Sequence, residues 1–151
     1  MAEPTREADD MPEVQDAILG QAKVSERFWS KVTKRGKDEC WLWTGSTNLK
    51  GYGVFRYKQR NYMAHRLTYE LLVGSIPEAL TLDHLCRNHP CTNPDHLEPI
   101  SNKDNILRGM GRAALNARKT HCLKGHPFDL LNTYIRAKGR GCRICRVERA
   151  K

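Results

Sequence analysis

The side chains best suited to chemistry in this chain are its six cysteines and six histidines, most of which fall into two groups. Each group holds three cysteines and one histidine at short spacings, with one more distant cysteine in the first. The first group is Cys40, Cys86, Cys91 and His96, and the second is Cys122, His126, Cys142 and Cys145. Three thiolates and one imidazole make a closed tetrahedral shell for structural zinc. We therefore predict two structural Zn²⁺ ions, each stabilising a segment too small to bury much apolar surface.

The cellular compartment bears on this interpretation, because the same cysteines could instead form three disulfides in a secreted protein or remain free buried thiols. The N-terminal residues lack the basic start and apolar core of a secretory signal. No stretch approaches the roughly 18 apolar residues of a membrane span. We expect an intracellular protein, neither secreted nor membrane-bound, whose thiols stay reduced.

The charge distribution points to a polyanionic partner. The chain has 26 Lys and Arg against 17 Asp and Glu, a net charge of +9. Residues 1–22 carry six acids and one base, so we predict a disordered acidic arm over residues 1–24. Residues 106–151 hold twelve bases against two acids, a net charge of +10. Nucleic acid is the usual partner of such a chain, bound largely through its phosphates.

Local patterns predict mixed helices and strands. Ser25 is a plausible N-cap for a helix through Val32, and Ser101 begins a helix of the [ST]-x-x-[DE] type. The other predicted elements are a strand at 40–44, a β-hairpin from 51–57 and 62–64, a helix at 65–73, and paired strands at 80–84 and 96–100.

The segment from Asp83 to Asn105 resembles the HNH, or ββα-metal, nucleases. A strand that ends in Asp-His, an Asn-Pro-x-His-Leu return strand and a following helix with Asn are similar to phage-type HNH endonucleases. Cysteines two and seven residues after His84, with His96 beyond them, resemble the His-Cys box homing endonucleases. Gly51-Tyr52-Gly53 and Ala64-His65-Arg66 also look like the phage-type proteins. The resemblance covers about residues 40–109 closely and the C-terminal segment more loosely.

This resemblance implies three catalytic residues. Phosphodiester hydrolysis needs an activated water and a cation on the phosphate. His84 can take the proton of the water, since a neutral imidazole is available near pH 7. Asn105 offers an amide oxygen to Mg²⁺, with Mn²⁺ as a substitute. Asp83 is a second ligand in the phage-type branch, whereas the His-Cys box branch does without it.

The remaining basic and imidazole side chains have less specific assignments. Arg56, Lys58 and Arg60 recur every second residue around the hairpin and could share one DNA-facing side. Arg56, Arg60 and Arg66 are candidates for contacting the scissile phosphate, and the sequence does not choose among them. The full set of candidates for DNA binding is Arg56, Lys58, Arg60, Arg66, Arg108 and Arg112. We expect His65 to be a hydrogen-bonded residue at a helix start, and His89 and His121 to be surface or loop residues, although His121 could compete as a zinc ligand. Asn93 is expected to shape its turn.

Together these features predict a small α+β, zinc-stabilised ββα-metal nuclease fold with an N-terminal β-hairpin and a basic C-terminal zinc segment. The predicted domains are the arm (1–24), the nuclease core (25–119) and the zinc segment (120–151). The expected function is metal-dependent DNA cleavage, by nicking or by double-strand breaks that would need a homodimer or sequential nicks. The alternatives are a non-enzymatic zinc DNA-binding regulator and a branched-DNA resolvase of the same superfamily.

Overall fold

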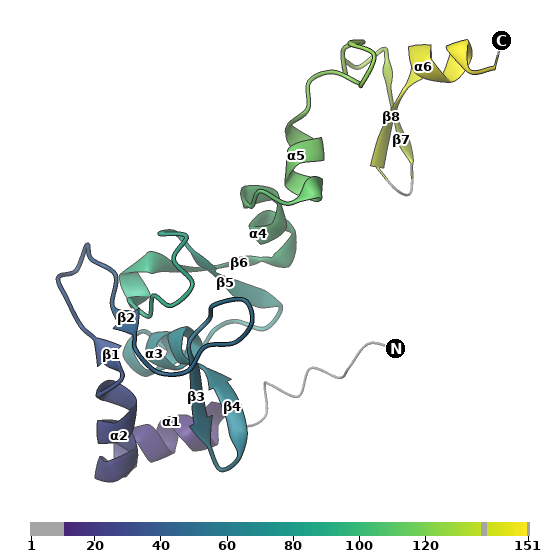
Figure 1. Cartoon of the computed structure of the whole chain (residues 1–151). Coiled ribbons are helices and arrows are strands. Elements are labelled where there is room, and N and C mark those ends of the chain that lie inside the picture. Colours follow the sequence, from purple (N-terminus) through teal and green to yellow (C-terminus); the bar gives the residue numbers. More distant parts are fainter. Residues whose placement is uncertain (1–10, 137–138, 151) are drawn as a thin grey trace. The chain divides into compact units, whose positions relative to one another are not determined.

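The computed structural model describes residues 11–136 and 139–150, in two compact units that divide after Asn102. The first unit comprises α1 (Met11–Gly20), α2 (Ala22–Trp29), β1 (Val32–Thr33), β2 (Leu42–Trp43), β3 (Val54–Tyr57), β4 (Arg60–Met63), α3 (Ala64–Leu72), β5 (Leu80–His84), the 3-10 helix η1 (Pro94–His96) and β6 (Leu97–Ser101) (Figure 1). The helix α4 (Asn102–Arg108) starts at the boundary, and α5 (Arg112–Arg118), β7 (Thr133–Arg136), β8 (Gly139–Cys142) and α6 (Arg143–Glu148) follow it. The strands form antiparallel two-stranded ribbons, and the predicted α+β class is confirmed.

Aromatic side chains fill the core of the first unit. Phe28 of α2 is fully buried, and its ring lies 5.1 Å from that of Phe55 and 5.5 Å from that of Trp43. Gly53 lies against Trp43 so closely that a Cβ on it would stand 2.6 Å from the indole ring. Glycine is therefore required at position 53, where the chain enters β3 against this core.

The N-terminal segment differs from the prediction. Residues 11–20 form α1, in which Val14, Ala17 and Ile18 are buried and Leu19 is 73% exposed. Burial at positions i, i+3 and i+4 is the pattern of an amphipathic helix packed on a core. The predicted disordered arm is thus wrong from Met11 onward, and the part of that prediction on residues 1–10 lies outside the described residues.

The start of the next helix also differs from the prediction. The helix α2 begins at Ala22 after Gln21, so Ser25 lies inside it and is not its N-cap. The predicted strand at 40–44 is shorter in the structure, where β2 covers only Leu42–Trp43, and this segment also pairs with the loop after β5. Trp43 N–H donates to Pro90 O at 2.9 Å, and Thr92 N–H donates to Trp41 O at 2.8 Å.

The predicted hairpin is confirmed, with a tighter turn. Strands β3 and β4 pair from Val54↔Met63 to Tyr57↔Arg60, leaving Lys58 and Gln59 as a two-residue turn with φ of 43° and 63°. Two positive φ angles in a row are typical of the type I′ turn, whose twist matches that of the flanking strands. The predicted helix that follows is α3.

The predicted strand pair and helix around the Asp-His sequence are confirmed. Strands β5 and β6 pair from Leu80↔Ser101 to His84↔Leu97. Asn102, the next residue after β6, opens α4. The order strand, return strand, helix is that of the ββα motif.

The second unit is held together by arginine contacts as well as by its β-ribbon. Arg118 of α5 donates to Leu107 O at 2.9 Å and to Arg108 O at 3.1 Å, joining α5 to α4. Arg140 of β8 donates to Asn116 O at 2.6 Å and also to Lys119 O, capping the C-terminal end of α5. The ribbon is thereby fixed to the end of α5. Where the functional domains begin and end stays a prediction. Within the described residues, no helix has both the length and the apolar composition of a membrane span.

Candidate functional site

The two residues of the Asp-His pair end β5 in a buried setting. Both Asp83 and His84 are 4% exposed. Asp83 is paired across the ribbon with Glu98, and His84 with Leu97, so the two carboxylates share one face and the imidazole takes the other. Arg87 of the following turn donates to Asp83 Oδ1 at 2.8 Å. Glu98, which the sequence reasoning missed, adds a second carboxylate to the Asp83 face.

The ring of His84 is oriented by a backbone carbonyl. Its Nε2 lies 3.0 Å from Cys91 O. A carbonyl oxygen only accepts, so Nε2 carries the hydrogen and Nδ1 of the neutral ring is the acceptor. Burial lowers the pKa of His84 below its usual range, with a smaller opposite effect from the Cys91 carbonyl. The ring is thus neutral at pH 7 and has one basic nitrogen, as a general base requires.

Aromatic rings surround His84 in a way that the sequence reasoning missed. The ring of Tyr52 lies 5.6 Å from that of His84, 5.4 Å from that of His65 and stacks on that of His89 at 4.4 Å. The rings of His65 and His84 are 4.8 Å apart. Tyr52 therefore contacts three imidazoles, and the only earlier signal was its place between two glycines.

The structure contradicts the role expected for His65 and confirms the one expected for His89. His65 is buried, and its Nδ1 has no hydrogen-bond partner among the described residues, so a hydrogen-bonded role through that atom is wrong. Burial and the nearby His84 lower the pKa of His65 to about 3. His89 is exposed as expected, and its Nδ1 lies 2.6 Å from Lys50 O.

Asn105, the third predicted catalytic residue, is the fourth residue of α4 and is half-buried. Its backbone carbonyl accepts from Gly109 N at 3.2 Å, at the end of the helix. The amide side chain is carried by a regular helix, which holds it in a narrow range of directions.

The first predicted zinc group comes together. The ligand atoms of Cys40, Cys86, Cys91 and His96 all lie within 4.8 Å of one another. His96 Nδ1 is 3.7 Å from Cys40 Sγ and 3.6 Å from Cys91 Sγ. Zinc–sulfur and zinc–nitrogen bonds of about 2.3 and 2.0 Å in a tetrahedron put such atoms about 3.5 to 3.8 Å apart. The spacing and the donor set therefore fit a tetrahedral metal ion.

Asn93 explains how Cys40, distant in sequence, joins this cluster. Its buried side chain donates through Nδ2 to Lys37 O and Glu39 O, both at 2.8 Å, and accepts from Asp95 N at 3.0 Å. The amide thus ties the segment just before Cys40 to the turn just before His96. The expectation that Asn93 shapes its turn is confirmed, and the long-range tie is an addition.

The second predicted zinc group also comes together. The ligand atoms of Cys122, His126, Cys142 and Cys145 lie within 4.8 Å of one another. Cys122 Sγ is 3.6 Å from Cys145 Sγ and 3.5 Å from His126 Nδ1. His121 is exposed, lies outside the cluster, and is 2.9 Å from Thr120 Oγ1 through its Nδ1.

A second layer of contacts supports this cluster. Glu148 Oε1 lies 3.8 Å from Nε2 of His126, the nitrogen that points away from the thiols. A carboxylate behind a ligating imidazole fixes the ring and raises its basicity. Asn132, buried and not anticipated, donates to Pro127 O at 2.5 Å and accepts from Ile144 N at 3.1 Å, joining the ligand loop to α6.

Thiols within the two clusters differ in pKa, because burial and neighbouring thiols act on each of them to a different extent. Burial, with neighbouring thiols, raises the pKa of Cys91 to about 12 and that of Cys145 to about 11. The pKa of Cys142 falls to about 6, because the Cys145 backbone N–H and nearby side chains outweigh the opposing effect of burial. A divalent cation would remove the repulsion between thiolates and would release protons on binding.

The predicted basic face of the hairpin is split. Arg60 is the cross-strand partner of Tyr57 and Arg56 that of Asn61, so Arg56 and Arg60 lie on opposite faces. Lys58 pairs with Glu13 of α1, which raises the pKa of the lysine. The interpretation as one continuous DNA-facing side is therefore wrong.

The other DNA-binding candidates lie on helices. Arg66 of α3 is partly buried, with Nη2 4.0 Å from Glu70 Oε1. Arg108 ends α4 and Arg112 opens α5, and both are exposed. Their binding to DNA stays a prediction.

Comparisons with known proteins agree with this geometry. Residues 62–107 match a family model described as HNH endonuclease. The chain is 37% identical over 68 residues to Protein 7.7 of Escherichia phage T7, covering 45% of this chain and 52% of that protein. It is 31% identical over 75 residues to the "Uncharacterized gene 5.3 protein" of Enterobacteria phage T3, covering 50% and 68%. It is 36% identical over 85 residues to Protein 2.8 of phage T7, covering 55% and 54%. The chain thus spans about half the length of both T7 relatives. No solved structure matches it significantly.

Proposed function

The chain belongs to the HNH endonuclease family, and from that premise we propose that it is a metal-dependent endonuclease that hydrolyses phosphodiester bonds of double-stranded DNA. The observation that carries this proposal is the placement of Asp83 and His84 at the end of β5, followed by the return strand β6 and by α4 with Asn105. The phage relatives suggest that it acts in the cytoplasm of a prokaryotic host.

His84 is the proposed general base. Its Nε2–H donates to Cys91 O, so Nδ1 is the atom that takes the proton from water. The resulting hydroxide forms a bond to phosphorus while the bond from phosphorus to the 3′ oxygen breaks. Burial keeps the imidazole neutral before the step, which is the form able to accept a proton.

Asn105, with Asp83, is proposed to hold Mg²⁺ or Mn²⁺ through its side-chain oxygen. When bound, this cation neutralises charge on the phosphate and on the departing oxygen. Mg²⁺ keeps most of its waters and needs few protein ligands, so one amide and one carboxylate suffice. The Arg87 contact to Asp83 Oδ1 would orient the carboxylate. Arg56, Arg60 and Arg66 remain the candidates for the scissile phosphate.

The two Cys₃His clusters are proposed to hold structural zinc. The ligand spacing matches a tetrahedral zinc shell, and four protein ligands leave no open position for chemistry. In this proposal the first ion holds the loop between β5 and β6, and the second holds the C-terminal segment.

The test is a plasmid-nicking assay with and without Mg²⁺, run on the full chain and on His84→Ala. The variant is expected to lose at least about 100-fold in rate, which is the usual size of a general-base contribution. Its zinc content and DNA affinity should stay at the wild-type level. Asp38→Asn, a change at an exposed acid in a loop, is the control and should cut normally.

Two outcomes would overturn the assignment. Wild-type cleavage by His84→Ala would exclude His84 as the base. DNA binding without any cleavage by the full chain, in either Mg²⁺ or Mn²⁺, would instead favour a non-enzymatic DNA-binding protein.

A further inference from the structure

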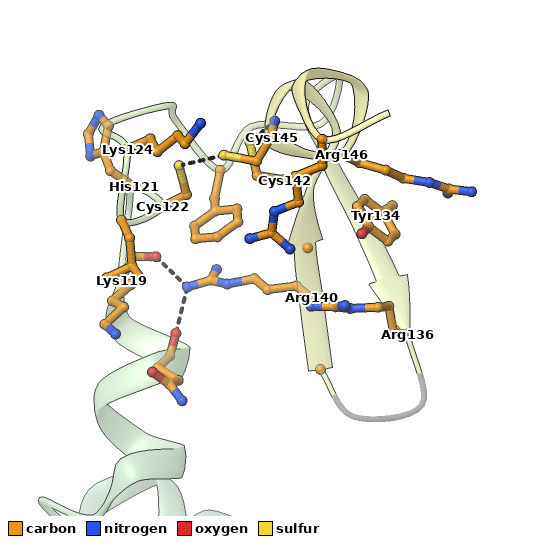
Figure 2. A pocket seen from close by; sticks show the side chains of 16 residues that line it. Lys119, His121, Cys122, Lys124, Tyr134, Arg136, Arg140, Cys142, Cys145 and Arg146 are labelled. Atoms are coloured by element: carbon orange, nitrogen blue, oxygen red, sulfur yellow. Dashed lines mark hydrogen bonds between the residues drawn. The ribbon is translucent and has the colours of Figure 1, made fainter. Parts of the chain in front are cut away.

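A basic cavity of about 510 Å³ lies in the second unit, against the C-terminal end of α5, the β7–β8 ribbon and α6 (Figure 2). Six basic side chains line it, and no carboxylate does so among the described residues. The six are Lys119, Lys124, Arg136, Arg140, Arg146 and Arg149. The cavity also borders the second zinc cluster through Cys122, Cys142 and Cys145.

Two of these cations already have structural partners. Lys124 Nζ lies 2.8 Å from Glu148 Oε2, on the acid that also faces His126. Arg140 caps the carbonyls at the end of α5 (Figure 2). Its guanidinium also lies 4.4 Å from the ring of Phe128. Both side chains therefore help to form the wall of the cavity, and their charges are already engaged by groups of the protein.

Arg136, Arg146 and Arg149 are different, because none of them forms an ion pair with a described residue. Arg136 and Arg146 both lie over Tyr134, with Cζ at 5.6 and 5.5 Å from the ring centre. Tyr134 is itself held against β8, since a Cβ on Gly141 would come within 2.5 Å of its ring. The tyrosine ring thus contacts both guanidinium groups, and both side chains line the same cavity.

Gathering like charges is unfavourable unless an anion lies between them. Guanidinium groups bind phosphate oxygens in a bidentate geometry, and contact with an aromatic face reduces the entropy lost on binding. A cavity with three unpaired arginines and no lining acid therefore fits a phosphate-rich ligand.

We propose that this cavity binds phosphate groups of the DNA backbone, as an anchoring site made by Arg136, Arg146 and Arg149 and separate from the catalytic residues. This inference rests on the proposed function for its ligand, since an endonuclease must hold its substrate. The site gives affinity without base selection, because backbone phosphates are the same in every sequence.

A competing explanation is that the arginines only balance the charge of the second zinc cluster. Three thiolates and one Zn²⁺ carry a net charge of −1, and the cavity borders those thiolates. In that case the arginines would affect zinc retention and not DNA affinity, which gives the test two separate readouts.

The test measures binding of a short labelled duplex to the full-length chain carrying His84→Ala, which prevents cleavage. In this background, Arg136→Gln with Arg146→Gln is compared with Arg143→Gln. Arg143 is an exposed residue of the same helix α6 that does not line the cavity. Zinc content and circular dichroism are recorded for each protein.

The double variant should weaken binding by about an order of magnitude per lost phosphate contact near 0.1 M salt. Its plot of log affinity against log salt should be shallower by roughly 2, while the Arg143→Gln control keeps the parent slope. Unlabelled duplex should compete for the site, and a free nucleoside triphosphate at equal phosphate concentration should compete poorly.

The inference is overturned if the double variant matches the control in affinity and salt slope, or if it loses zinc while its DNA affinity stays unchanged. If the double substitution disturbs folding, Arg149→Gln alone gives the same comparison with an expected slope change of roughly 1. Loss of the inference leaves the nuclease assignment standing, because nicking by the wild-type chain is measured separately.

Discussion

The imidazole Nε2 of His84 lies 3.0 Å from the backbone carbonyl oxygen of Cys91, whose own Sγ belongs to the first metal cluster. One residue therefore joins the proposed base to the proposed zinc site. The loop that carries these metal-ligand candidates also orients the proposed base, because the Cys91 carbonyl decides which nitrogen of His84 carries the hydrogen.

This link predicts that damage to the first cluster stops cleavage. Cys86→Ser should lower zinc by one ion per chain and reduce nicking by roughly 100-fold, because the Cys91 carbonyl no longer holds the base. Cys145→Ser should also remove one zinc, from the second cluster, but should keep the turnover rate at saturating DNA. Zinc stoichiometry and single-turnover nicking would measure both. Equal turnover in the two variants would contradict the link.

Tyr52 is predicted to position His84 by ring contact alone. Tyr52→Ala should lower the turnover rate by roughly 10- to 100-fold with little change in the KM for DNA, since a small displacement of a base is costly. Tyr52→Phe keeps the ring contacts of 4.4 to 5.6 Å and should retain most of the activity. If the phenylalanine variant is as slow as the alanine variant, the hydroxyl and not the ring is what matters.

Asn105 is predicted to act through the metal ion. Asn105→Ala should raise the Mg²⁺ concentration for half-maximal nicking by roughly 10- to 100-fold, whereas Asn105→Asp keeps an oxygen ligand and should cost less. A chelator of weak affinity should stop the wild-type reaction without changing zinc content or circular dichroism. An unchanged Mg²⁺ dependence in Asn105→Ala would remove this residue from the metal site.

The sequence predicted the parts of the site whose spacing is local. Cys142 and Cys145 are three positions apart at the start of a helix, and Asp83 and His84 end a strand that pairs with its near neighbour. Chain connectivity already brings such residues together. Cys40 was assigned correctly to the first cluster, because it was the one cysteine left to serve as the fourth ligand there.

Contacts that depend on tertiary packing could not be predicted in this way. Tyr52 contacts three imidazoles that lie in separate segments of the chain, and no periodic sequence pattern predicts these contacts. Arg56 and Arg60 lie on opposite faces because the hairpin turn has only two residues. This turn contains no glycine, so the sequence carries no signal for its length. The prediction of a disordered arm relied on the acidic charge of residues 11–20 and so missed three buried apolar positions. Net charge does not depend on which face of a helix each side chain occupies.

The helix α1 gives a direct stability prediction. Ile18 is 1% exposed, so Ile18→Ala should lower the free energy of unfolding by roughly 2 to 5 kcal/mol. Leu19→Ala, at a neighbouring exposed position, should change it by less than about 0.5 kcal/mol. Urea unfolding followed by tryptophan fluorescence reports on the first unit, which contains all three tryptophans. Similar values for the two variants would mean that α1 does not pack on the core.

Acid sensitivity is predicted to come partly from His65, whose pKa burial lowers to about 3 in the folded chain. The unfolded chain binds the proton near pH 6.5, so stability is full above that pH and is lost as pH falls toward 3. Between pH 7 and pH 5 this one group should lower the free energy of unfolding by about 2 kcal/mol. His65→Gln removes the titration, and the exposed His121→Gln should keep it. Metal loss at low pH affects all three proteins alike, so the difference in slope between the variants isolates His65, and parallel slopes would show that its burial has no such effect.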